Sequence, residues 1–372
     1  MLDPIHIRHH LHQIPELAYD EYKTKAFLMQ QLQELITPGS LFRILEFKNS
    51  NGILVEYNNG KTQDNYKLFR ADMDALPTIE KSGCSFASIH PGLMHACGHD
   101  VHMAVLMALI QKVQQYHPAQ NLLFLFQPAE EGHGGAESII NENILQGYDI
   151  RAAFALHVGS DLPVGTISSK SGIFFGIPQE FDLRFVGKAS HVAFPEKGIN
   201  ALAAGMHFYE ELLKEIPDLS REERVIFHVG KMSAGQVRNI IADECLMEGT
   251  HRTLSKAMRD RLNTLIQKHA QAAADAIGAQ TELRLLGTYD PVVNNAELES
   301  NLREICNQMD YSYLPAETVM TGEDFGFFSS MYPALLFWLG SGSDMPLHSG
   351  YFLPDDDCIE VGANVMWGLL QS

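Results

Sequence analysis

Three things are scarce in this sequence: cysteine, basic residues and long apolar runs. The 372 residues include only five cysteines, an odd number spread widely along the chain, which argues against a disulfide framework and predicts free thiols. No apolar run approaches the roughly 18 residues that span a bilayer, and the histidine-rich start, residues 1–13, lacks the apolar core of a signal peptide. We therefore expect a cytoplasmic protein.

The charge balance narrows the class of partner. With 27 Lys and Arg against 46 Asp and Glu, the formal net charge is -19, which repels nucleic acid and anionic membrane surfaces. The hydrophobic content of 45% is ordinary for a globular protein, and the length allows two or three domains with a sizeable core. The expected partner is a small molecule rather than nucleic acid or a membrane.

The first half of the chain predicts an α/β domain. Helical apolar spacing runs from Asp3 to Leu35 with a break at Pro15, and strands then begin to alternate with helices. Alternation of this kind implies a largely parallel sheet with helices on both faces. The expected strands are residues 41–47, 53–57, 67–71, 121–126 and 151–157, and the further helices are residues 103–115 and 136–144.

The pattern changes from about Gln179, where the order of elements becomes βαββαβ, as in a ferredoxin-like domain. A helix at 299–309 and a strand at 334–339 then return to the first sheet. The predicted fold class is therefore α/β, with a mostly parallel-sheet catalytic domain, residues 1–177 and 288–372, and an inserted satellite domain, residues 178–287. The satellite's expected strands are 180–186, 225–230, 244–250 and 281–286, and its helices are 201–216 and 256–276.

The most informative motif is a Cys-x-His step, Cys97-Gly98-His99, which is followed along the chain by Glu130-Glu131, His157 and His348. A thiolate, imidazoles and a carboxylate suit one or two transition-metal ions, and the second glutamate is then available for acid–base chemistry. Several of these residues follow predicted strands, as do Asp72 and Asp74, and the carboxyl ends of strands form the ligand crevice of open α/β sheets. The set predicts a metallohydrolase.

Each member of this set has an ordinary structural explanation when it is taken alone. A single cysteine is usually a small buried hydrophobe, and adjacent glutamates commonly stabilise a helix start. For Cys97 we expect more, because Gly98 permits a sharp turn and the positive N-terminus of the following helix favours an ionised thiolate. It is the joint occurrence of the residues that indicates a metal site.

Motifs along nearly the whole chain resemble the aminoacylase, carboxypeptidase and hippurate hydrolase family of dinuclear metal amidohydrolases. Two of them, TGEDFG at Thr321–Gly326 and FWLG at Phe337–Gly340, favour the diaminopimelate branch of that family. The resemblance implies a zinc-peptidase-like catalytic domain. The other matching stretches are RHHLHQIPE (8–16), RADMDALP (70–77), GLMHACGHDVHM (92–103), FLFQPAEEGHGGA (124–136), ALHV (155–158), GKASHVAFP (187–195), NIIADECLMEGTHRT (239–253) and LHSGYF (347–352).

The resemblance also assigns roles, position by position. Glu130 becomes the general base and acid, and Asp74 becomes an orienting carboxylate, while Asp72 has no role beyond structure. From the satellite domain, His191 is expected to stabilise the oxyanion, and Asn239 and Arg252 to hold the amino-acid carboxylate; in this family His191 can act across a dimer interface. The implied ligands of two divalent ions (Zn, Mn, Co or Ni) are Cys97, which bridges, with His99, Glu131, His157 and His348.

The expected reaction is removal of an acyl group from an N-acyl amino acid, with deacetylation of N-acetyl-diaminopimelate in lysine biosynthesis as the favoured case. A broad N-acyl amino acid or hippurate hydrolase and a dipeptidase use the same metals and remain alternatives. Two further alternatives belong to other classes: a nucleotide-binding protein, suggested by residues 132–135 (GHGG), and a non-catalytic metal-binding or dimerisation protein. A homodimer or homotetramer is expected to form through the satellite domain.

Three positions depart from the family pattern. His348 lies in Leu-His-Ser, where relatives often carry a second histidine, so it is the single candidate ligand there. His251 stands where an apolar residue is more typical, and Ser190 replaces a smaller residue before His191. These departures predict a shifted substrate preference.

Overall fold

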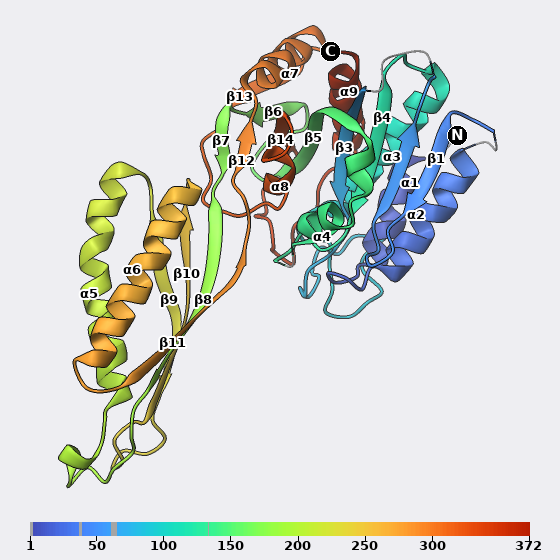
Figure 1. Ribbon diagram of the computed structural model, residues 1–372. Helices are drawn as coiled ribbons and strands as arrows, with labels where there is room; N and C mark the ends of the chain where they lie inside the picture. The colour runs from blue at the N-terminus through green and yellow to red at the C-terminus, as the bar shows by residue number, and fades with distance from the viewer. Residues whose placement is uncertain (1–2, 37–38, 61–64, 133) are drawn as a thin grey trace. The chain divides into compact units, whose positions relative to one another are not determined.

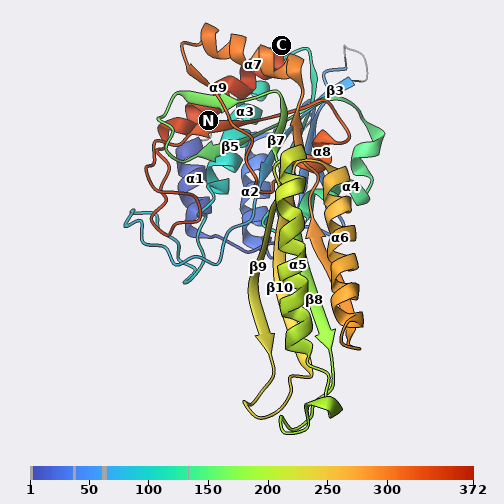
Figure 2. The ribbon, with the colours of Figure 1, turned by 90° about the vertical axis from the view of Figure 1, so that its left-hand side faces the viewer.

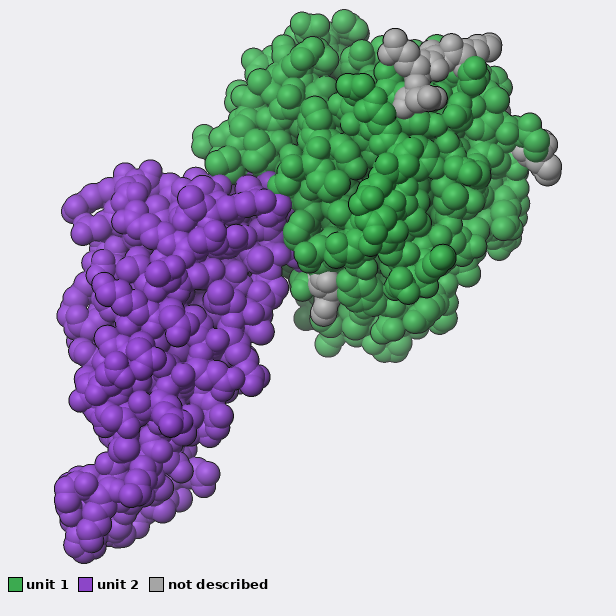
Figure 3. Space-filling view, in the orientation of Figure 1, with its two compact units in different colours: residues 1–174, 292–318, 324–372 green, residues 175–291, 319–323 purple. Residues whose placement is uncertain are grey.

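The computed structural model describes residues 3–36, 39–60, 65–132 and 134–372. It divides into two compact units, which Figure 3 colours separately. The first contains residues 1–174, 292–318 and 324–372, and the second contains residues 175–291 and 319–323. The short segment 319–323 belongs to the second unit, whereas the sequence assigned it to the catalytic domain.

An eight-stranded sheet forms the centre of the first unit, in the order β1-β2-β4-β3-β5-β14-β6-β13 (Figure 1). Its four middle strands, β4, β3, β5 and β14, run parallel to one another, while β1 and β2 are antiparallel additions at one edge. The predicted α/β class with a large, mostly parallel central sheet is confirmed. The strands are β1 (Phe42–Glu46), β2 (Ile53–Tyr57), β3 (Asn65–Asp72), β4 (Asn121–Gln127), β5 (Asp149–Gly159), β6 (Thr166–Ser169), β13 (Ser312–Pro315) and β14 (Ala334–Gly340), with β7 (Gly172–Phe175) and β12 (Val292–Asn294) forming a separate pair.

Helices cover both faces of this sheet. Every residue of β4 is buried, and alternate side chains of the strand point to opposite faces. Leu122, Phe124 and Phe126 share a core with α1, α2, α3, α7 and α9, whereas α4 and α8 contact β4 and β14 and carry buried residues outside that core. The helices are α1 (Pro4–Gln13), α2 (Tyr22–Leu35), α3 (His99–Tyr116), α4 (Gly135–Asn141), α7 (Ala296–Gln308), α8 (Gly326–Ser329) and α9 (Asp357–Gln371), with a 3₁₀ turn at Ile144–Gly147.

The start of α3 requires glycine. Gly98 is the N-cap of this helix with φ 80°, a left-handed conformation that strains residues with a side chain. A Cβ atom at this position would also lie 2.4 Å from Cγ2 of Val158, the residue after His157 on β5. The glycine therefore lets the helix start approach the end of β5, and this brings Cys97 and His99 beside His157.

The second unit has the element order β8-α5-β9-β10-α6-β11 and a four-stranded antiparallel sheet in the order β11-β8-β10-β9 (Figure 2). Along β10, buried and more exposed residues alternate, as expected for a sheet with one face packed against helices. Phe185, Met247 and Phe208 belong to the resulting core between this sheet and the two helices. The bounds are β8 (Ile177–Val186), α5 (Ala201–Glu222), β9 (Ile226–Ala234), β10 (Glu244–Thr253), α6 (Lys256–Asp275) and β11 (Gln280–Thr288), with a 3₁₀ turn at Pro195–Lys197.

The break expected at Pro15 is confirmed, because the chain leaves helical conformation after Gln13 and resumes it only at Tyr22. Other elements differ from those expected. The short strands β6, β7, β12 and β13 and the C-terminal helix α9 were not predicted. Among the described residues, no helix combines the length and the apolar character needed to cross a membrane.

Candidate metal centre

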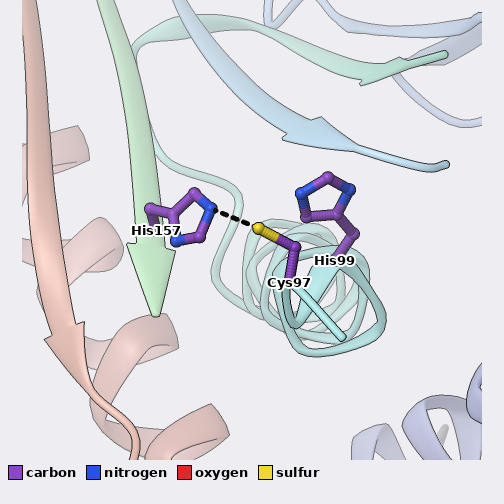
Figure 4. Close-up of side chains that lie close together, drawn as sticks. All are labelled: Cys97, His99 and His157. Carbon is purple, nitrogen blue, oxygen red and sulfur yellow. Dashed lines mark hydrogen bonds between the residues drawn. The ribbon is translucent and has the colours of Figure 1, made fainter. Parts of the chain in front are cut away.

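Side chains from four parts of the first unit meet beyond the carboxyl ends of its parallel strands. Cys97 precedes Gly98, the N-cap of α3, and His99 is the first residue of that helix, while His157 lies near the end of β5 (Figure 4). Glu130 and Glu131 follow β4, and His348 lies in the loop between β14 and α9. The five predicted ligands and Glu130 are thus gathered in one region, although up to 251 residues separate Cys97 from its partners.

Cys97 is the common member of this cluster. Its Sγ atom lies 3.3 Å from Nε2 of His157 and 3.3 Å from Nε2 of His348. Sulfur and nitrogen ligands of one tetrahedral ion are about 3.5 Å apart, given metal–ligand distances near 2.0 to 2.3 Å. Each of the two sulfur–nitrogen pairs therefore has a spacing close to that of two ligands on the same ion.

The donors form two groups that both contain Cys97. Cys97, His99 and His157 are one group, and Cys97, Glu131 and His348 are the other; within each, the potential ligand atoms all lie within 4.8 Å of one another. Oε1 of Glu131 is 3.6 Å from Nε2 of His348. A sulfur atom can bridge two ions only if it belongs to the ligand group of each ion, and Cys97 meets this requirement.

Backbone hydrogen bonds fix the orientation of two imidazoles. Nδ1 of His99 donates to the carbonyl oxygen of Asp74 at 2.8 Å, and Nδ1 of His157 donates to the carbonyl oxygen of Val158 at 2.8 Å. Nδ1 therefore carries a proton in both rings and Nε2 is the nitrogen left for the site, which is how metal-binding histidines are usually held. Nε2 of His99 is buried without a hydrogen-bond partner, a costly state that a cation would relieve.

Asp74 organises the glutamate pair. Its carboxylate accepts hydrogen bonds from the backbone N–H groups of Glu130 at 3.0 Å and Glu131 at 2.9 Å, and its carbonyl oxygen accepts from His99. One buried residue thereby fixes three members of the cluster. These contacts are those of the orienting carboxylate that the sequence predicted.

The positive end of α3 is not the only influence on Cys97. Burial raises the pKa of this thiol well above its usual value, and the nearby charges of Glu131, Glu130 and Asp72 raise it further. These effects oppose the helix start, so a bound cation would be the main group that favours the thiolate. Burial also lowers the pKa of His157 well below its usual value, which favours the neutral ring that binds metal.

A second layer of buried charged residues supports the centre, and a role for most of them was not predicted. Asp72 accepts from Nδ1 of His102 at 2.6 Å, and Nε2 of His102 accepts the N–H of Val158 at 2.9 Å, next to His157. Asp72 also pairs with Arg70, whose guanidinium reaches Asp324 of the TGEDFG motif. His102 lies three residues after His99 on α3, and this helical spacing is the signal that could have identified it.

His348 occupies an unusual backbone position. Its φ is 66°, in the left-handed region that most residues with a side chain avoid, and its N–H donates to the carbonyl oxygen of Ala96 at 2.9 Å. This bond joins the loop of His348 to the residue before Cys97. The side chain is 57% exposed, so His348 is the most accessible of the clustered donors.

The candidate residues of the second unit are not gathered in the same way. His191 forms a bridge with Ile240, and the carbonyl oxygen of Asn239 accepts the N–H of Val192 at 3.1 Å, so His191 and Asn239 lie on adjacent loops. Both residues are exposed. The two loops, which follow β8 and β9, lie at the end of the satellite sheet where these two strands terminate (Figures 1 and 2).

Arg252 lies at the other end of the same sheet. On β10, Glu244 pairs with Val186 where the loops begin, and Arg252 pairs with Pro178 eight residues farther along, or about 26 Å at the usual strand rise. Its guanidinium is 3.4 Å from the carboxylate of Glu180. A single chain therefore does not bring Asn239 and Arg252 to one carboxylate, contrary to the simplest form of the predicted clamp.

The predicted departure at position 251 has a structural explanation. His251 faces the interior of the second unit, where burial lowers its pKa to about 4. Its Nε2 atom is bonded to Oδ1 of Asn263 on α6 at 2.7 Å. The unusual histidine is therefore matched by a polar partner and faces the helix layer.

The glycine-rich segment gives little support to nucleotide binding. His133 lies outside the described residues, but the first amides of α4 are already used: Gly135 N–H donates to the carbonyl oxygen of Ala129, and Ala136 N–H donates to Asp324. A phosphate would need such amides to be free. The carboxylate of Asp324 occupies the place that an anion would take.

A further cluster of metal-binding residue types contains His12, Glu80 and Cys84. His12 is held between Asp100 at 2.9 Å and Glu80 at 3.2 Å, and the Cys84 thiol contacts Glu80. Burial alone lowers the pKa of His12, but Asp100 and Glu80 outweigh it and raise the value to about 10. A protonated imidazole already satisfies these groups, so this cluster is an ion-pair network.

A mixed α/β unit whose strands end in buried thiol, imidazole and carboxylate groups has the architecture of a metallohydrolase. Residues 68–372 match peptidase family M20/M25/M40, and the chain belongs to this family. The predicted family and the predicted hydrolase class are both confirmed by this match.

Relatives of known name agree with this placement. The N-acetyldiaminopimelate deacetylase of Oceanobacillus iheyensis is 35% identical over 375 residues, with 100% of each chain covered. The protein of the same name from Streptococcus uberis is 36% identical over 363 residues, with 97% of this chain and 96% of that one covered. Among solved structures, the Bacillus subtilis YXEP protein, described as a dinuclear metal binding peptidase of the M20 family, aligns with a TM-score of 0.84 at 28% identity over 99% of this chain and 96% of its own.

Proposed function

We propose that this protein is a metal-dependent amidohydrolase that removes the acetyl group from N-acetyl-diaminopimelate. The observation that carries the proposal is the position of Cys97, which belongs to two groups of metal-binding donors and touches a histidine of each. The full-length relatives named N-acetyldiaminopimelate deacetylase supply the substrate. We further propose that residues 178–287 form a satellite domain inserted in the catalytic domain.

The clustered residues fit two divalent ions. The buried, unpartnered Nε2 of His99 and a donor set of one thiol, three imidazoles and one carboxylate suit first-row metals such as Zn, Mn, Co or Ni. We assign Cys97 as the bridging ligand, with His99, His157, His348 and Glu131 completing the set. When bound, the ions would activate water and polarise the acyl oxygen.

The protein's own residues account for the proton transfers. Glu130 takes a proton from the attacking water and gives it to the departing amine. We assign this role to Glu130 rather than to Glu131, because the side chain of Glu131 is turned toward His348 and Cys97. Asp74 holds Glu130 in place through the backbone amide, which preserves the distance over which the proton moves. The products are acetate and diaminopimelate.

Recognition of the substrate requires residues of the second unit. We assign His191 to the oxyanion and Arg252 and Asn239 to the carboxylates of diaminopimelate, which a guanidinium can bind in a bidentate manner. Because His191 and Arg252 lie at opposite ends of one satellite sheet, we propose that one site takes these two residues from different copies of the chain. A homodimer is the smallest assembly that meets this requirement.

A substrate panel tests the proposal. The metal-loaded enzyme would be assayed for free amine released from N-acetyl-diaminopimelate, N-acetyl-methionine, hippurate, an indoleacetyl amino acid and a dipeptide. We expect the highest kcat/KM for N-acetyl-diaminopimelate. A higher value for hippurate or the dipeptide would reject the substrate and keep the class, whereas no hydrolysis of any compound would leave a non-catalytic metal protein.

A further inference from the structure

We propose that Glu21 is a positioning residue for the reaction, and that its side chain fixes the turn which presents Glu130 and Glu131. This inference rests on the proposed function for its catalytic meaning, but the contacts that carry it are structural. Glu21 immediately precedes α2 and lies 108 residues before Ala129, the residue that it contacts.

The turn in question is built on a strained residue. Ala129 has φ 59°, in the left-handed region, and it immediately precedes the glutamate pair. A residue with a Cβ atom disfavours this conformation unless neighbouring groups hold it. Ala129 is fully buried, so its N–H group also needs a protein partner.

Glu21 supplies that partner. Its Oε1 atom accepts the N–H of Ala129 at 2.9 Å, while the next two N–H groups, of Glu130 and Glu131, go to the carboxylate of Asp74. Three successive backbone amides are thus held by two buried carboxyl groups. The direction of the chain through the glutamate pair depends on both, and the sequence predicted only Asp74.

The side chain of Glu21 does not cap α2, although Glu21 is the N-cap residue of this helix. A carboxylate at the N-cap of a helix normally accepts the first amides of that helix, yet Glu21 makes no such bond. Glu16 performs this task instead, because its Oε2 atom accepts the N–H groups of Lys23 and Thr24. The carboxylate of Glu21 is therefore available to accept the N–H of Ala129 in the turn before Glu130 and Glu131.

The surroundings of Glu21 fix it in this role. Its Oε1 atom also accepts the N–H of Tyr19, a second left-handed residue, and its Oε2 atom accepts Nδ2 of Asn51 at 3.1 Å. Burial raises the pKa of Glu21 to about 7, and the charge of Asp74 adds to the rise. A buried side chain with three hydrogen bonds has little freedom to move.

The test compares Glu21→Gln with Glu16→Gln in the metal-loaded protein. Glutamine at position 21 keeps one side-chain oxygen and replaces the other with an NH₂ group. This donor faces the Nδ2 donor of Asn51, so the hydrogen bond from the N–H of Ala129 weakens. Glu16 is the matched control, since it is a buried carboxylate of the same segment that contacts the start of α2 and not the catalytic loop. We expect kcat to fall about 10- to 100-fold for Glu21→Gln with KM little changed, and to stay within about two-fold for Glu16→Gln.

Amide hydrogen exchange gives a readout that does not need turnover. For Glu21→Gln we expect faster exchange confined to the amides of residues 129–131, with the rest of the first unit unchanged. Wild-type exchange at these amides, or faster exchange throughout the unit, would overturn the positioning role. If the wild-type protein deacetylates nothing, the proposed function fails, and the exchange result still decides whether Glu21 holds this turn.

Discussion

The two units of this protein hold their candidate functional residues in opposite ways. In the first unit, Cys97, His99 and His157 are buried and held to within hydrogen-bonding distance of fixed neighbours. In the second unit, His191 and Asn239 are exposed on loops at one end of a sheet, and Arg252 lies at the other end. One chain gathers the candidate metal ligands, whereas it leaves His191 and Arg252 at opposite ends of one sheet, which is why the proposed recognition site takes them from two copies.

The largest effect is expected in the first unit, from Glu130→Gln. Loss of the proton carrier should lower kcat by about 10²- to 10⁴-fold, because general acid–base catalysis contributes that much. Metal content measured by mass spectrometry should stay at the wild-type level. Glu131→Gln is the contrasting variant, since it should lose metal as well as activity; a Glu130→Gln enzyme with wild-type turnover would remove Glu130 from the mechanism.

A smaller effect of a different kind is expected in the second unit, from Arg252→Ala. A charged hydrogen bond to the substrate carboxylate is lost, so KM for N-acetyl-diaminopimelate should rise about 10- to 100-fold with metal content unchanged. Arg284→Ala is the matched control, because Arg284 is an exposed arginine on β11 that pairs with Glu282. Equal KM values for the two variants would discard the carboxylate role of Arg252.

Mixing two impaired variants tests whether one site takes residues from two copies of the chain. If His191 and Arg252 of one site come from different copies, His191→Ala and Arg252→Ala chains should complement each other. After co-refolding at equal amounts, half of the dimers are mixed and each has one intact site, so about a quarter of wild-type activity should return. Activity no higher than the mean of the two parents would place both residues of a site on one chain.

The smallest effect concerns stability and leaves catalysis intact. The pKa of His12 is about 10 in the folded protein and about 6.5 when unfolded, so its ion pairs stabilise the fold fully below pH 6.5 and this contribution is lost as the pH rises through 10. Wild-type stability should therefore fall between pH 7 and 10, with a contribution from His12 of at most about 1.4 kcal/mol per pH unit.

The His12→Asn variant should lose this part of the slope. Urea unfolding followed by tryptophan fluorescence suits the measurement, because both tryptophans, Trp338 and Trp367, belong to the first unit. His207→Gln, a change at an exposed histidine of α5, should keep the wild-type slope. An unchanged slope in the His12→Asn variant would show that the network is not held by a protonated imidazole.

The sequence predicted those features that depend on local pattern. Apolar runs predicted the buried strands β4, β5 and β14, and the joint occurrence of thiol, imidazole and carboxylate residues predicted a metal site whose candidate members lie together in the structure. The short strands β6, β7, β12 and β13 were missed because three or four residues carry too little periodicity to be recognised.

Long-range contacts limited the rest of the prediction. Glu21 carries no signal in the sequence that links it to a residue 108 positions away, and only the fold reveals that its carboxylate reaches Ala129. Arg70 and Asp324 lie 254 residues apart and pair only because β3 and the segment before α8 converge. The raised pKa of Cys97 depends first on burial and then on carboxylates from other segments, and the local sequence of the helix start reveals neither.

The central claim, that one thiol joins two metal sites, can be tested by X-ray diffraction from crystals of the metal-loaded protein at the absorption edge of the metal. We expect two anomalous peaks, each within about 2.5 Å of Sγ of Cys97, with His157 and His348 bound to different ions. A single peak, or peaks that do not contact Cys97, would contradict it.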